Sequence, residues 1–449
     1  MNIHFVGIGG IGISALAQFC VKRGDRVTGS DLQESVITDK LREQGIKVFM
    51  PQKKENVPRD TDLMVYSEAV DEKNPERQYA KEKNIPQKSY FEYLGEVSQK
   101  YRVIAVCGTH GKTTTTAMIG HGFLKINFDA TVIVGTTVKE WGDTNFHAGT
   151  NEWLVVEACE YRNNFRFLHP EIVVLTDLDH DHPDSFPTED SYWQAFSDFC
   201  AKAKTVIFHD NKKSQRVLEG HKGQKIPVND SEIIPLDYAF GEHNQRNARL
   251  VVAVFSLLLP DTNPSPDLNS KVRTLGKFQK ALEDFRTPGR RQDYLGEING
   301  VKIYDDYAHH PAELDALIEA FRGKFPKAKL AMIFEPHQFS RTKEFLNEFA
   351  EVLRKVDILG IMPIYAARDT DEDKKIMPVE KLIALIPGAM LIKSEKDVSK
   401  ITSSQLHAGD LLVFAGAGYV SDFAHLLVKP PSHFLHSHKS LEASHPPNE

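Results

Sequence analysis

The chain has little cysteine, no long apolar run and no excess of basic residues, and each absence excludes a class of protein. Its four cysteines stand far apart and form no C-x-x-C pair: Cys20, Cys107, Cys159 and Cys200. This spacing disfavours a disulfide framework or a cysteine zinc site and is typical of reduced cytosolic thiols. No apolar stretch approaches the roughly 20 residues of a membrane-spanning helix. The net charge of −7 offers no basic field for nucleic acid.

The first residues contain no positively charged segment ahead of an apolar one. "MNIHFVGIGG" reads directly as a strand followed by a turn, so we expect no signal peptide. The sequence therefore predicts a cytoplasmic protein with no membrane insertion and no nucleic-acid partner. Its 449 residues, 41% apolar and 26% charged, are typical of a globular protein. The sequence gives no indication of oligomeric state.

Strand and helix signals alternate along three successive segments. The predicted strands run over 3–8, 26–31, 62–70, 102–108, 152–158, 171–179, 301–307, 329–336, 357–364 and 409–418. The predicted helices run over 12–24, 311–325 and 342–356, and a further helix is predicted to begin at Lys112. Such alternation favours an α/β fold with a mainly parallel sheet covered on both faces. We place domains at 1–98, 99–290 and 291–428. The polar, proline-rich tail 429–449 is expected to be disordered, and its histidines imply no fixed ligand geometry.

A glycine-rich turn lies between the first predicted strand and the first predicted helix. "GIGGIG", residues 7–12, satisfies G-x-G-x-x-G, and Asp31 ends the next strand, where a ribose-binding acid is expected. Glycines here let the backbone approach a pyrophosphate, and the helix N-terminus favours its negative charge. The pattern predicts a dinucleotide or another pyrophosphate nucleotide, such as a UDP-sugar. A tight turn made only for packing is the alternative.

A second loop, "GTHGKTT" at 108–114, follows the strand "RVIAVC" and opens a helix. It is shorter than the usual G-x-x-x-x-G-K-[ST], because Val106 occupies the place of the first glycine and Gly108 comes two residues later. The shorter loop can still bind nucleotide phosphates. Backbone N–H groups can surround phosphates, Lys112 can reach the β/γ oxygens, and Thr113 can bind Mg²⁺.

Acids follow the next two predicted strands. Glu157 ends an apolar strand at the edge where α/β sheets bind ligands, so it is a candidate Mg²⁺ ligand; a surface acid at a strand end is the alternative. The following strand ends in "TDLDHDHPDSF". This stretch holds Asp177, Asp179, His180, Asp181, His182 and Asp184. The cluster favours a second cation or a general base over an ordinary polar loop.

Two later motifs also carry polar groups at element ends. In "GEHNQRNARL", Asn244 and Asn247 are one helical turn apart and suit an adenine edge, although the sequence alone favours helix capping. In "YDDYAHHPAEL", two acids end a strand, His309 and His310 follow, and Pro311 takes the favoured first helical position. Adjacent histidines beside two acids suggest that these side chains contact a ligand; the alternative is that they are ordinary loop residues.

In this order, the six motifs resemble those of the Mur ligase family over roughly residues 1–425. The family's loop has the form G-T-x-G-K-T-T, which "GTHGKTT" matches, so the loop is intact. The resemblance implies three α/β domains: an N-terminal Rossmann-like domain for a UDP-sugar, a central P-loop ATPase domain with a mainly parallel sheet, and a C-terminal Rossmann-like ligase domain. It is strongest to the branch that joins L-alanine to UDP-N-acetylmuramate through an acyl phosphate, using ATP and two Mg²⁺ ions.

The resemblance also implies a role for each matching residue. The UDP-sugar site would comprise Gly7, Gly9, Gly10, Ile11, Gly12, Ser14, Asp31 and Ser67. The ATP site would comprise Gly108, Thr109, His110, Gly111, Lys112, Thr113, Thr114, Asn244, Asn247, Arg291 and Asp306. Thr113 and Glu157 would hold one Mg²⁺, and His182, in the D-H-x-D pattern of residues 181–184, the second. The catalytic set would be Lys112, Glu157, His182, His310 and Arg341, with His309 on the face that meets the nascent amide.

The sequence departs from the usual Mur ligase pattern at three places. Many relatives read P-H-R-Y-T-R-T where this chain reads "PHQFSRT", and Gln338 lacks the planar cation of arginine. Asp177 stands where relatives often have asparagine. No lysine follows the D-H-x-D until Lys202, although most Mur ligases carry a carbamylated lysine there; the alanine-adding branch lacks it too.

Three other functions are alternatives. They are a ligase that attaches a ready-made tripeptide to the same sugar nucleotide, an NAD-dependent dehydrogenase built on "GIGGIG", and a non-catalytic nucleotide-binding regulator.

Overall fold

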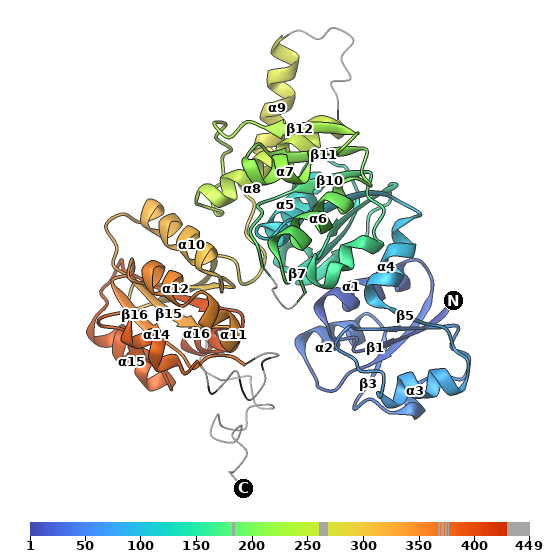
Figure 1. The fold of residues 1–449 in the computed structure, drawn as a ribbon, viewed down its shortest axis with the longest axis horizontal. Helices are drawn as coiled ribbons and strands as arrows, with labels where there is room; N and C mark the ends of the chain where they lie inside the picture. Colours follow the sequence, from blue (N-terminus) through green and yellow to red (C-terminus); the bar gives the residue numbers. More distant parts are fainter. Residues whose placement is uncertain are drawn as a thin grey trace. The chain divides into compact units, whose positions relative to one another are not determined.

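The structure is a computed structural model that describes residues 1–181, 185–259, 268–366, 369, 372, 375 and 377–428, with the backbone only over 268–275. The chain divides into two compact units, Met1–Gly289 and Arg290–Glu449. The first unit contains two β-sheets and the second contains one (Figure 1). Each unit is described by itself below.

The first sheet has five parallel strands in the order β3-β2-β1-β4-β5. Its strands are β1 Asn2–Val6, β2 Arg26–Ser30, β3 Lys47–Phe49, β4 Leu63–Tyr66 and β5 Gln87–Ser89, and its helices are α1 Ile11–Lys22, α2 Val36–Glu43, α3 Pro75–Glu82 and α4 Tyr90–Ser98, with the 3₁₀ turn η1 Lys54–Asn56. A capping box between Ser89 and Glu92 begins α4 directly after β5. The first residue of that helix is therefore Tyr90.

The second sheet has seven strands in the order β12-β11-β10-β6-β9-β7-β8, all parallel except the β7–β8 pair. The strands are β6 Arg102–Cys107, β7 Thr131–Val138, β8 Thr144–His147, β9 Trp153–Glu157, β10 Ile172–Leu175, β11 Thr205–His209 and β12 Gln224–Val228. The helices are α5 Lys112–Lys125, α6 Glu189–Cys200, α7 Lys212–Val217, α8 Glu242–Leu258 and α9 Leu268–Glu283, with η2 Lys139–Trp141 and η3 Tyr161–Phe167.

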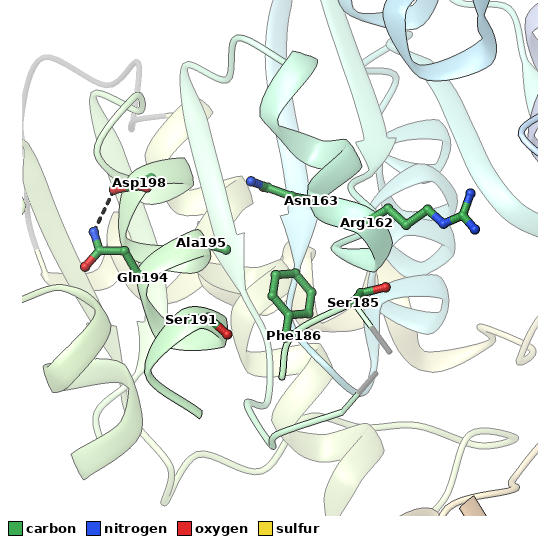
Figure 2. Close-up of a pocket in the computed structure, with 8 residues that line it drawn as sticks. All are labelled: Arg162, Asn163, Ser185, Phe186, Ser191, Gln194, Ala195 and Asp198. Atoms are coloured by element: carbon green, nitrogen blue, oxygen red, sulfur yellow. Dashed lines mark hydrogen bonds between the residues drawn. The ribbon is translucent and has the colours of Figure 1, made fainter. Parts of the chain in front are cut away.

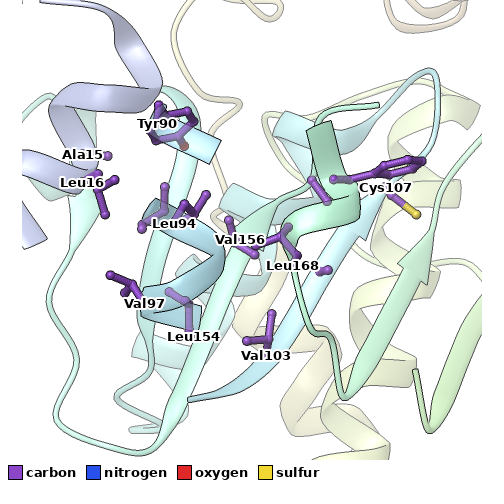
Figure 3. Close-up of a cluster of buried hydrophobic side chains, with 14 of the residues drawn as sticks. Ala15, Leu16, Tyr90, Leu94, Val97, Val103, Cys107, Leu154, Val156 and Leu168 are labelled. Carbon is purple, nitrogen blue, oxygen red and sulfur yellow. The ribbon is translucent and has the colours of Figure 1, made fainter. Parts of the chain in front are cut away.

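Two apolar cores cover the two faces of the second sheet. One contains side chains of α5, α8 and α9. The other contains side chains of α1, α4 and α6, so it joins the first sheet's helices to the second sheet (Figure 3). Because strands buried on both faces must be apolar throughout, β6, β9 and β10 read as the continuous apolar runs from which they were predicted.

The order of the central strands brings the predicted site residues to one edge. β6 lies between β9 and β10, with Val106 opposite Glu157 and Cys107 opposite Leu175. Parallel strands end at the same edge, so the loop 108–111, Glu157 and the chain after Leu175 meet there.

The second unit has one six-stranded sheet in the order β13-β14-β18-β15-β16-β17, parallel except for β13–β14. The strands are β13 Asp293–Ile298, β14 Val301–Asp306, β15 Leu330–Glu335, β16 Ile358–Ile361, β17 Met390–Leu391 and β18 Leu411–Gly416, and the helices are α10 Pro311–Lys324, α11 Phe339–Glu344, α12 Leu346–Leu353, α14 Val379–Ala384, α15 Glu395–Ser404 and α16 Val420–Val428.

One predicted helix is wrong in this unit. The sequence predicts a single helix over 342–356, whereas the structure has α11 and α12 separated by Phe345, whose φ of −103° and ψ of 28° leave the helical region. The Phe345 ring packs edge-on against His310 at a centroid distance of 4.8 Å. Apolar periodicity continues on both sides of the break, so the sequence pattern does not reveal it.

The predicted α/β architecture with mainly parallel sheets is confirmed. The boundaries drawn at residues 98/99 and 290/291 stay a prediction, and the tail 429–449 lies outside the described residues. Over the residues that the structure describes, no helix combines the length and apolar character needed to cross a membrane.

Candidate active site

Two glycines shape the loop between β6 and α5. Gly108 has a φ of +141° and Gly111 a φ of +83°. A Cβ atom at Gly108 would lie 2.1 Å from Thr176 Oγ1 and 2.8 Å from the Asp177 carbonyl oxygen, and one at Gly111 would lie 2.5 Å from Asn247 Oδ1. Only glycine fits at either position. The short spacing seen in the sequence therefore forms a closely packed phosphate-binding type of loop.

We expect Gly108→Ala to destabilise the first unit far more than Gly24→Ala. Gly24 also has a positive φ, +93°, but nothing lies within 4 Å of its would-be Cβ, so it isolates the backbone cost of about 1–2 kcal/mol. Gly108→Ala adds the clash with Thr176 and Asp177, for a total of about 2–5 kcal/mol. Denaturant unfolding followed by tryptophan fluorescence measures both. Equal losses would contradict the packing argument.

Lys112, the first residue of α5, is held by four oxygens. Its Nζ donates to the carbonyls of Gly108 at 2.7 Å and Thr109 at 3.0 Å, and lies 3.0 Å from each carboxylate oxygen of Glu160. The Glu160 side chain is 1% exposed. Burial lowers the pKa of Lys112, but the charge and hydrogen bond of Glu160, together with the charges of Cys159 and Glu157, outweigh it, so the net pKa is raised and the ammonium stays charged.

Sequence reasoning missed Glu160. It lies in "VVEACEYRNNF", residues 155–165, three positions after Glu157, yet nothing in that pattern separates a buried counter-ion from an exposed acid. One signal could have identified it. A lysine that is desolvated to bind phosphate needs a counter-ion, and Glu160 is the acid three residues after Glu157.

Glu157 and Thr113 meet at the edge of the sheet. The Thr113 hydroxyl donates to Glu157 Oε1 at 2.8 Å, and the backbone N–H of Gly135 donates to Oε2 at 2.7 Å. Both carboxylate oxygens thus accept hydrogen bonds, although Glu157 ends β9 and stays partly exposed, so its role as a metal ligand stays a prediction. A hydroxyl and a carboxylate side by side are oxygen ligands of the kind that Mg²⁺ takes.

The predicted second metal site cannot be placed. His182, with Asp184 of the D-H-x-D pattern, lies outside the described residues. Within 1–181, 185–259 and the other described ranges, no three His, Cys, Asp or Glu side chains converge in a metal-binding arrangement.

Asp179 is committed to ion pairs instead. It lies 3.4 Å from His110 Nε2 and pairs with Lys213. Burial raises its pKa, but hydrogen bonds from His110 and Lys213 outweigh this and lower the pKa to about 2. The Thr109 hydroxyl donates to the Asp179 carbonyl at 2.6 Å and shares a 2.6 Å hydrogen bond with the buried Tyr192. These contacts join the phosphate loop to the segment after β10 and to α6, and sequence reasoning did not select Tyr192.

The two asparagines of α8 lie near the loop and do not cap the helix. The N-cap of α8 is Gly241, without a side-chain cap, so the capping interpretation is wrong. Asn244 Nδ2 donates to the Phe240 carbonyl at 3.0 Å, and Asn247 packs against Gly111. Thr114 is buried in the first turn of α5. The adenine role of both asparagines stays a prediction.

The glycine turn 7–12 is held by the strands on either side. The N–H groups of Gly7 and Ile8 donate to the Ser30 carbonyl at 2.9 and 3.0 Å, and Gly9 N–H donates to Asp31 Oδ2 at 2.7 Å. The Cβ of Ser67 lies 3.0 Å from the place of a Cβ at Gly7. The structure thus brings Asp31 and Ser67 to the turn as predicted.

The remaining members of the predicted UDP-sugar set lie at the start of α1. Gly10 is the N-cap, and Ile11 and Gly12 form the first turn. Ser14 is fully buried; its hydroxyl donates to the Ile11 carbonyl at 2.9 Å and accepts from Asn145 at 3.0 Å. In this structure Ser14 joins α1 to β8, and its contact with a sugar nucleotide stays a prediction.

In the second unit, Asp306 ends β14 and is buried. Its two oxygens accept backbone N–H groups from Gln292 at 2.7 Å and Ala308 at 2.8 Å. Burial raises its pKa to about 6. The guanidinium of Arg291 lies 5.1 Å from the Tyr307 ring centre, at the same edge of the sheet.

The histidine pair takes defined positions at the start of α10. His310 is the N-cap, its Nδ1 accepting from Ala312 N–H at 3.3 Å, while Glu313 completes the capping box. His309 Nδ1 lies 2.9 Å from the Tyr307 carbonyl oxygen, and burial lowers the His309 pKa. Arg341 is buried in α11. Their catalytic roles stay predictions.

Glu335, at the end of β15, is a buried acid that sequence reasoning did not select. It is 3% exposed, and its Oε2 accepts the Val420 N–H at 2.9 Å. Burial raises its pKa from 4.5 to about 7. A Cβ at Gly418 would lie 2.5 Å from Oε2, so the glycine makes room for this carboxyl group.

We expect Glu335→Gln to stabilise the second unit at pH 8 and to change little at pH 4.5. The folded pKa lies above the unfolded value, so the folded state binds the proton more tightly and loses stability as pH rises from about 4.5 to about 7. Glutamine removes this loss, worth up to about 3 kcal/mol. Hydrogen exchange of β15 and β18 amides at the two pH values tests it. An effect of equal size at both would point to lost packing instead.

A pocket of about 780 Å³ lies between η3 and α6 (Figure 2). Arg162 and Asn163 line it from η3, where both have positive φ, and Gln194 and Asp198 line it from α6, joined by a 2.8 Å hydrogen bond. None of its lining residues was singled out from the sequence. We assign it no part in the reaction.

Comparisons with known proteins follow the same three segments. The description "Mur ligase family, catalytic domain" matches residues 2–102, "Mur ligase middle domain" matches 106–233, and "Mur ligase, glutamate ligase domain" matches 290–418. A UDP-N-acetylmuramate–L-alanine ligase of Caldicellulosiruptor bescii is 34% identical, over 96% of this chain and 99% of its own. One from Bdellovibrio bacteriovorus is 34% identical, over 93% and 96%.

Solved structures agree. The UDP-N-acetylmuramate–alanine ligase of Thermotoga maritima matches with a TM-score of 0.77 and 26% identity, over 95% of this chain and 98% of its own. A murein peptide ligase from Psychrobacter arcticus matches with a TM-score of 0.69 and 21% identity, over 95% and 98%, a likeness that shows the fold alone. The resemblance read from the motifs is confirmed: the chain belongs to the Mur ligase family.

Proposed function

We propose that the protein joins L-alanine to UDP-N-acetylmuramate through an amide bond, with ATP converted to ADP and phosphate. The observation that carries this is the 34% identity to a ligase of that name along 99% of its length. The phosphate loop supports it. Lys112, Thr113 and Glu157 gather within one hydrogen-bonded cluster at the sheet edge, where ATP chemistry of this type requires them.

The reaction must overcome the low reactivity of a carboxylate. ATP transfers its γ-phosphoryl group to the carboxylate of the sugar nucleotide, and the resulting acyl phosphate is attacked by the amine of alanine. A tetrahedral oxyanion forms, and phosphate leaves as the amide forms. Lys112, held charged by Glu160, offsets the negative charges that approach one another in the first step.

Thr113 and Glu157 fit a magnesium ion because their oxygens lie 2.8 Å apart at the mouth of the loop. When bound, Mg²⁺ would neutralise charge on the β- and γ-phosphates. We propose His182 as ligand of a second ion, on the family pattern alone.

The second unit would supply groups for the later step and for the nucleotide. By family position we assign Arg291 and Asp306 to ATP and His310 and Arg341 to the attacking amine and the acyl phosphate. Gln338 replaces an arginine of many relatives, so one cationic contact is missing from this set. We also propose the domain limits 1–98, 99–290 and 291–428.

The test is phosphate release from ATP and Mg²⁺ with UDP-N-acetylmuramate, compared across L-alanine, glycine, L-serine, the tripeptide and no amine. Release that requires both the sugar nucleotide and L-alanine supports the proposal. Release only with the tripeptide would assign the protein to the tripeptide-adding branch. No release under any condition would leave the dehydrogenase and regulator alternatives, which NAD binding then separates.

A further inference from the structure

Tyr90 is the first residue of α4 and lies against the glycine turn of the predicted sugar-nucleotide site. A Cβ at Gly12 would lie 2.9 Å from Tyr90 Cζ and 3.1 Å from its hydroxyl oxygen. The last glycine of "GIGGIG" is therefore needed to make room for the edge of this ring. Gly12 is the second residue of α1, two positions after the N-cap Gly10.

The ring and the hydroxyl of Tyr90 have different surroundings. The ring belongs to the apolar core that also contains Ala15 and Leu16 of α1 (Figure 3), and the whole residue is 9% exposed. The hydroxyl makes no hydrogen bond within 1–181, 185–259 or the remaining described ranges, and its oxygen keeps some exposure to solvent. It is therefore open to a ligand oxygen beside the glycine turn, where it now faces water.

Tyr93, one turn further along α4, shows the ordinary arrangement. Its ring lies in the same core, but its hydroxyl accepts from Arg23 Nη2 at 2.7 Å, at the opposite end of α1. Packing therefore explains both rings and one hydroxyl. It leaves the Tyr90 hydroxyl, beside the helix N-terminus, without a structural role.

The Tyr90 hydroxyl is protonated and therefore available as a hydrogen-bond donor. Burial raises the pKa of Tyr90, and the charge of Glu157 raises it further, so the hydroxyl stays protonated and acts as a donor. Glu157 marks where the carboxylate of the sugar nucleotide must arrive for phosphorylation, while the start of α1 marks where the diphosphate is favoured.

We propose that the Tyr90 hydroxyl donates a hydrogen bond to the diphosphate of the bound sugar nucleotide, a positioning contact that rests on the proposed function. The observations behind it are the fit of the ring edge against Gly12, the absence of a partner for the hydroxyl among the described residues, and its place beside the first turn of α1. Donation to an ionised oxygen makes it one of the stronger hydrogen bonds that a neutral side chain can form.

Tyr90→Phe tests the contact because it removes only the hydroxyl and keeps the ring against Gly12. Calorimetric titration would measure the dissociation constants of UDP-N-acetylmuramate and of UDP for the full-length protein, without ATP or alanine. We expect both to rise about tenfold. In turnover, KM for the sugar nucleotide rises similarly, while kcat and KM for ATP stay within about twofold. Tyr93→Phe is the matched control and leaves both dissociation constants unchanged.

Each other outcome is decisive. Unchanged affinity for both ligands in Tyr90→Phe would overturn the contact. Weaker binding of UDP-N-acetylmuramate with unchanged binding of UDP would overturn the diphosphate assignment, because the contact would then be with the sugar. A wild-type protein that binds neither ligand would overturn the proposed function itself, whatever the variants do.

Discussion

Replacing Lys112 by methionine is expected to lower kcat for phosphate release by about 10³-fold or more. Methionine keeps the length of the side chain but removes the charge that faces the transferred phosphoryl group. The lysine is already charged and is held by Glu160 and two carbonyl groups. Little free energy is therefore needed to orient its ammonium group during the reaction.

The same substitution also destabilises the fold, and the two effects must be separated. Lys112→Met leaves Glu160 buried without its cation, which costs about 3–5 kcal/mol. The double variant Lys112→Met with Glu160→Gln removes that charge. We expect it to recover most of the stability and none of the activity.

Tryptophan fluorescence during denaturant unfolding gives the stability, since all three tryptophans lie in the first unit: Trp141, Trp153 and Trp193. Lys125→Met is the matched control, because Lys125 ends the same helix and its one side-chain partner among the described residues is the exposed Asp284. It should leave kcat unchanged. Substantial turnover in the double variant would show that Lys112 has no role in phosphoryl transfer.

The sequence predicts the sheets and the phosphate loop well, because both depend on local patterns. Continuous apolar runs identify strands that are buried on both faces, and the strand–loop–helix context identifies "GTHGKTT" despite its short spacing. The parallel order then brings Glu157 to Lys112 and Thr113, as the strand-end positions predicted.

What the sequence hides are contacts between elements that are distant along the chain. Tyr192 reaches Thr109 across 83 residues, and Tyr90 reaches Gly12 from the next helix but two. An aromatic residue in an amphipathic helix reads as ordinary core, so neither hydroxyl could be assigned a partner. Glu160 and Glu335 were missed for a related reason: their burial is a property of packing and not of local spacing.

The break between α11 and α12 has the same origin. Apolar periodicity predicts one helix, whereas Phe345 leaves the helical region and its ring packs against His310 at the start of another helix, a contact that local spacing does not reveal. The capping interpretation of Asn244 failed because Gly241, three residues earlier, already starts the helix.

The second large effect is expected at Glu157. We predict that Glu157→Gln lowers kcat by about 10²–10³-fold at a fixed low Mg²⁺ concentration, because an amide is a neutral and weaker ligand than a carboxylate. The substituted side chain keeps the size of glutamate. Its oxygen can still accept from Thr113, but its NH₂ group then faces the N–H of Gly135, so one hydrogen bond is lost.

A Mg²⁺ titration separates loss of the metal from loss of structure. If Glu157 binds the ion, the variant needs a higher Mg²⁺ concentration for half-maximal activity, and added Mg²⁺ restores part of kcat. Unfolding measured by tryptophan fluorescence should show a loss of only about 0.5–1.5 kcal/mol, because water can replace the acceptor at the exposed Gly135 N–H.

Glu152→Gln is the matched control, because Glu152 immediately precedes the same strand at the opposite edge of the sheet, where it pairs with Arg102 on the surface. Its removal should change neither kcat nor the Mg²⁺ requirement.

If Glu157→Gln lowered kcat with an unchanged Mg²⁺ requirement, the carboxylate would act by holding Thr113 and Gly135 in place, and the metal would have to be held by other groups. If it left kcat unchanged, the assignment of the catalytic edge to β6 and β9 would be wrong, because no other carboxylate hydrogen-bonds to Thr113 among the described residues.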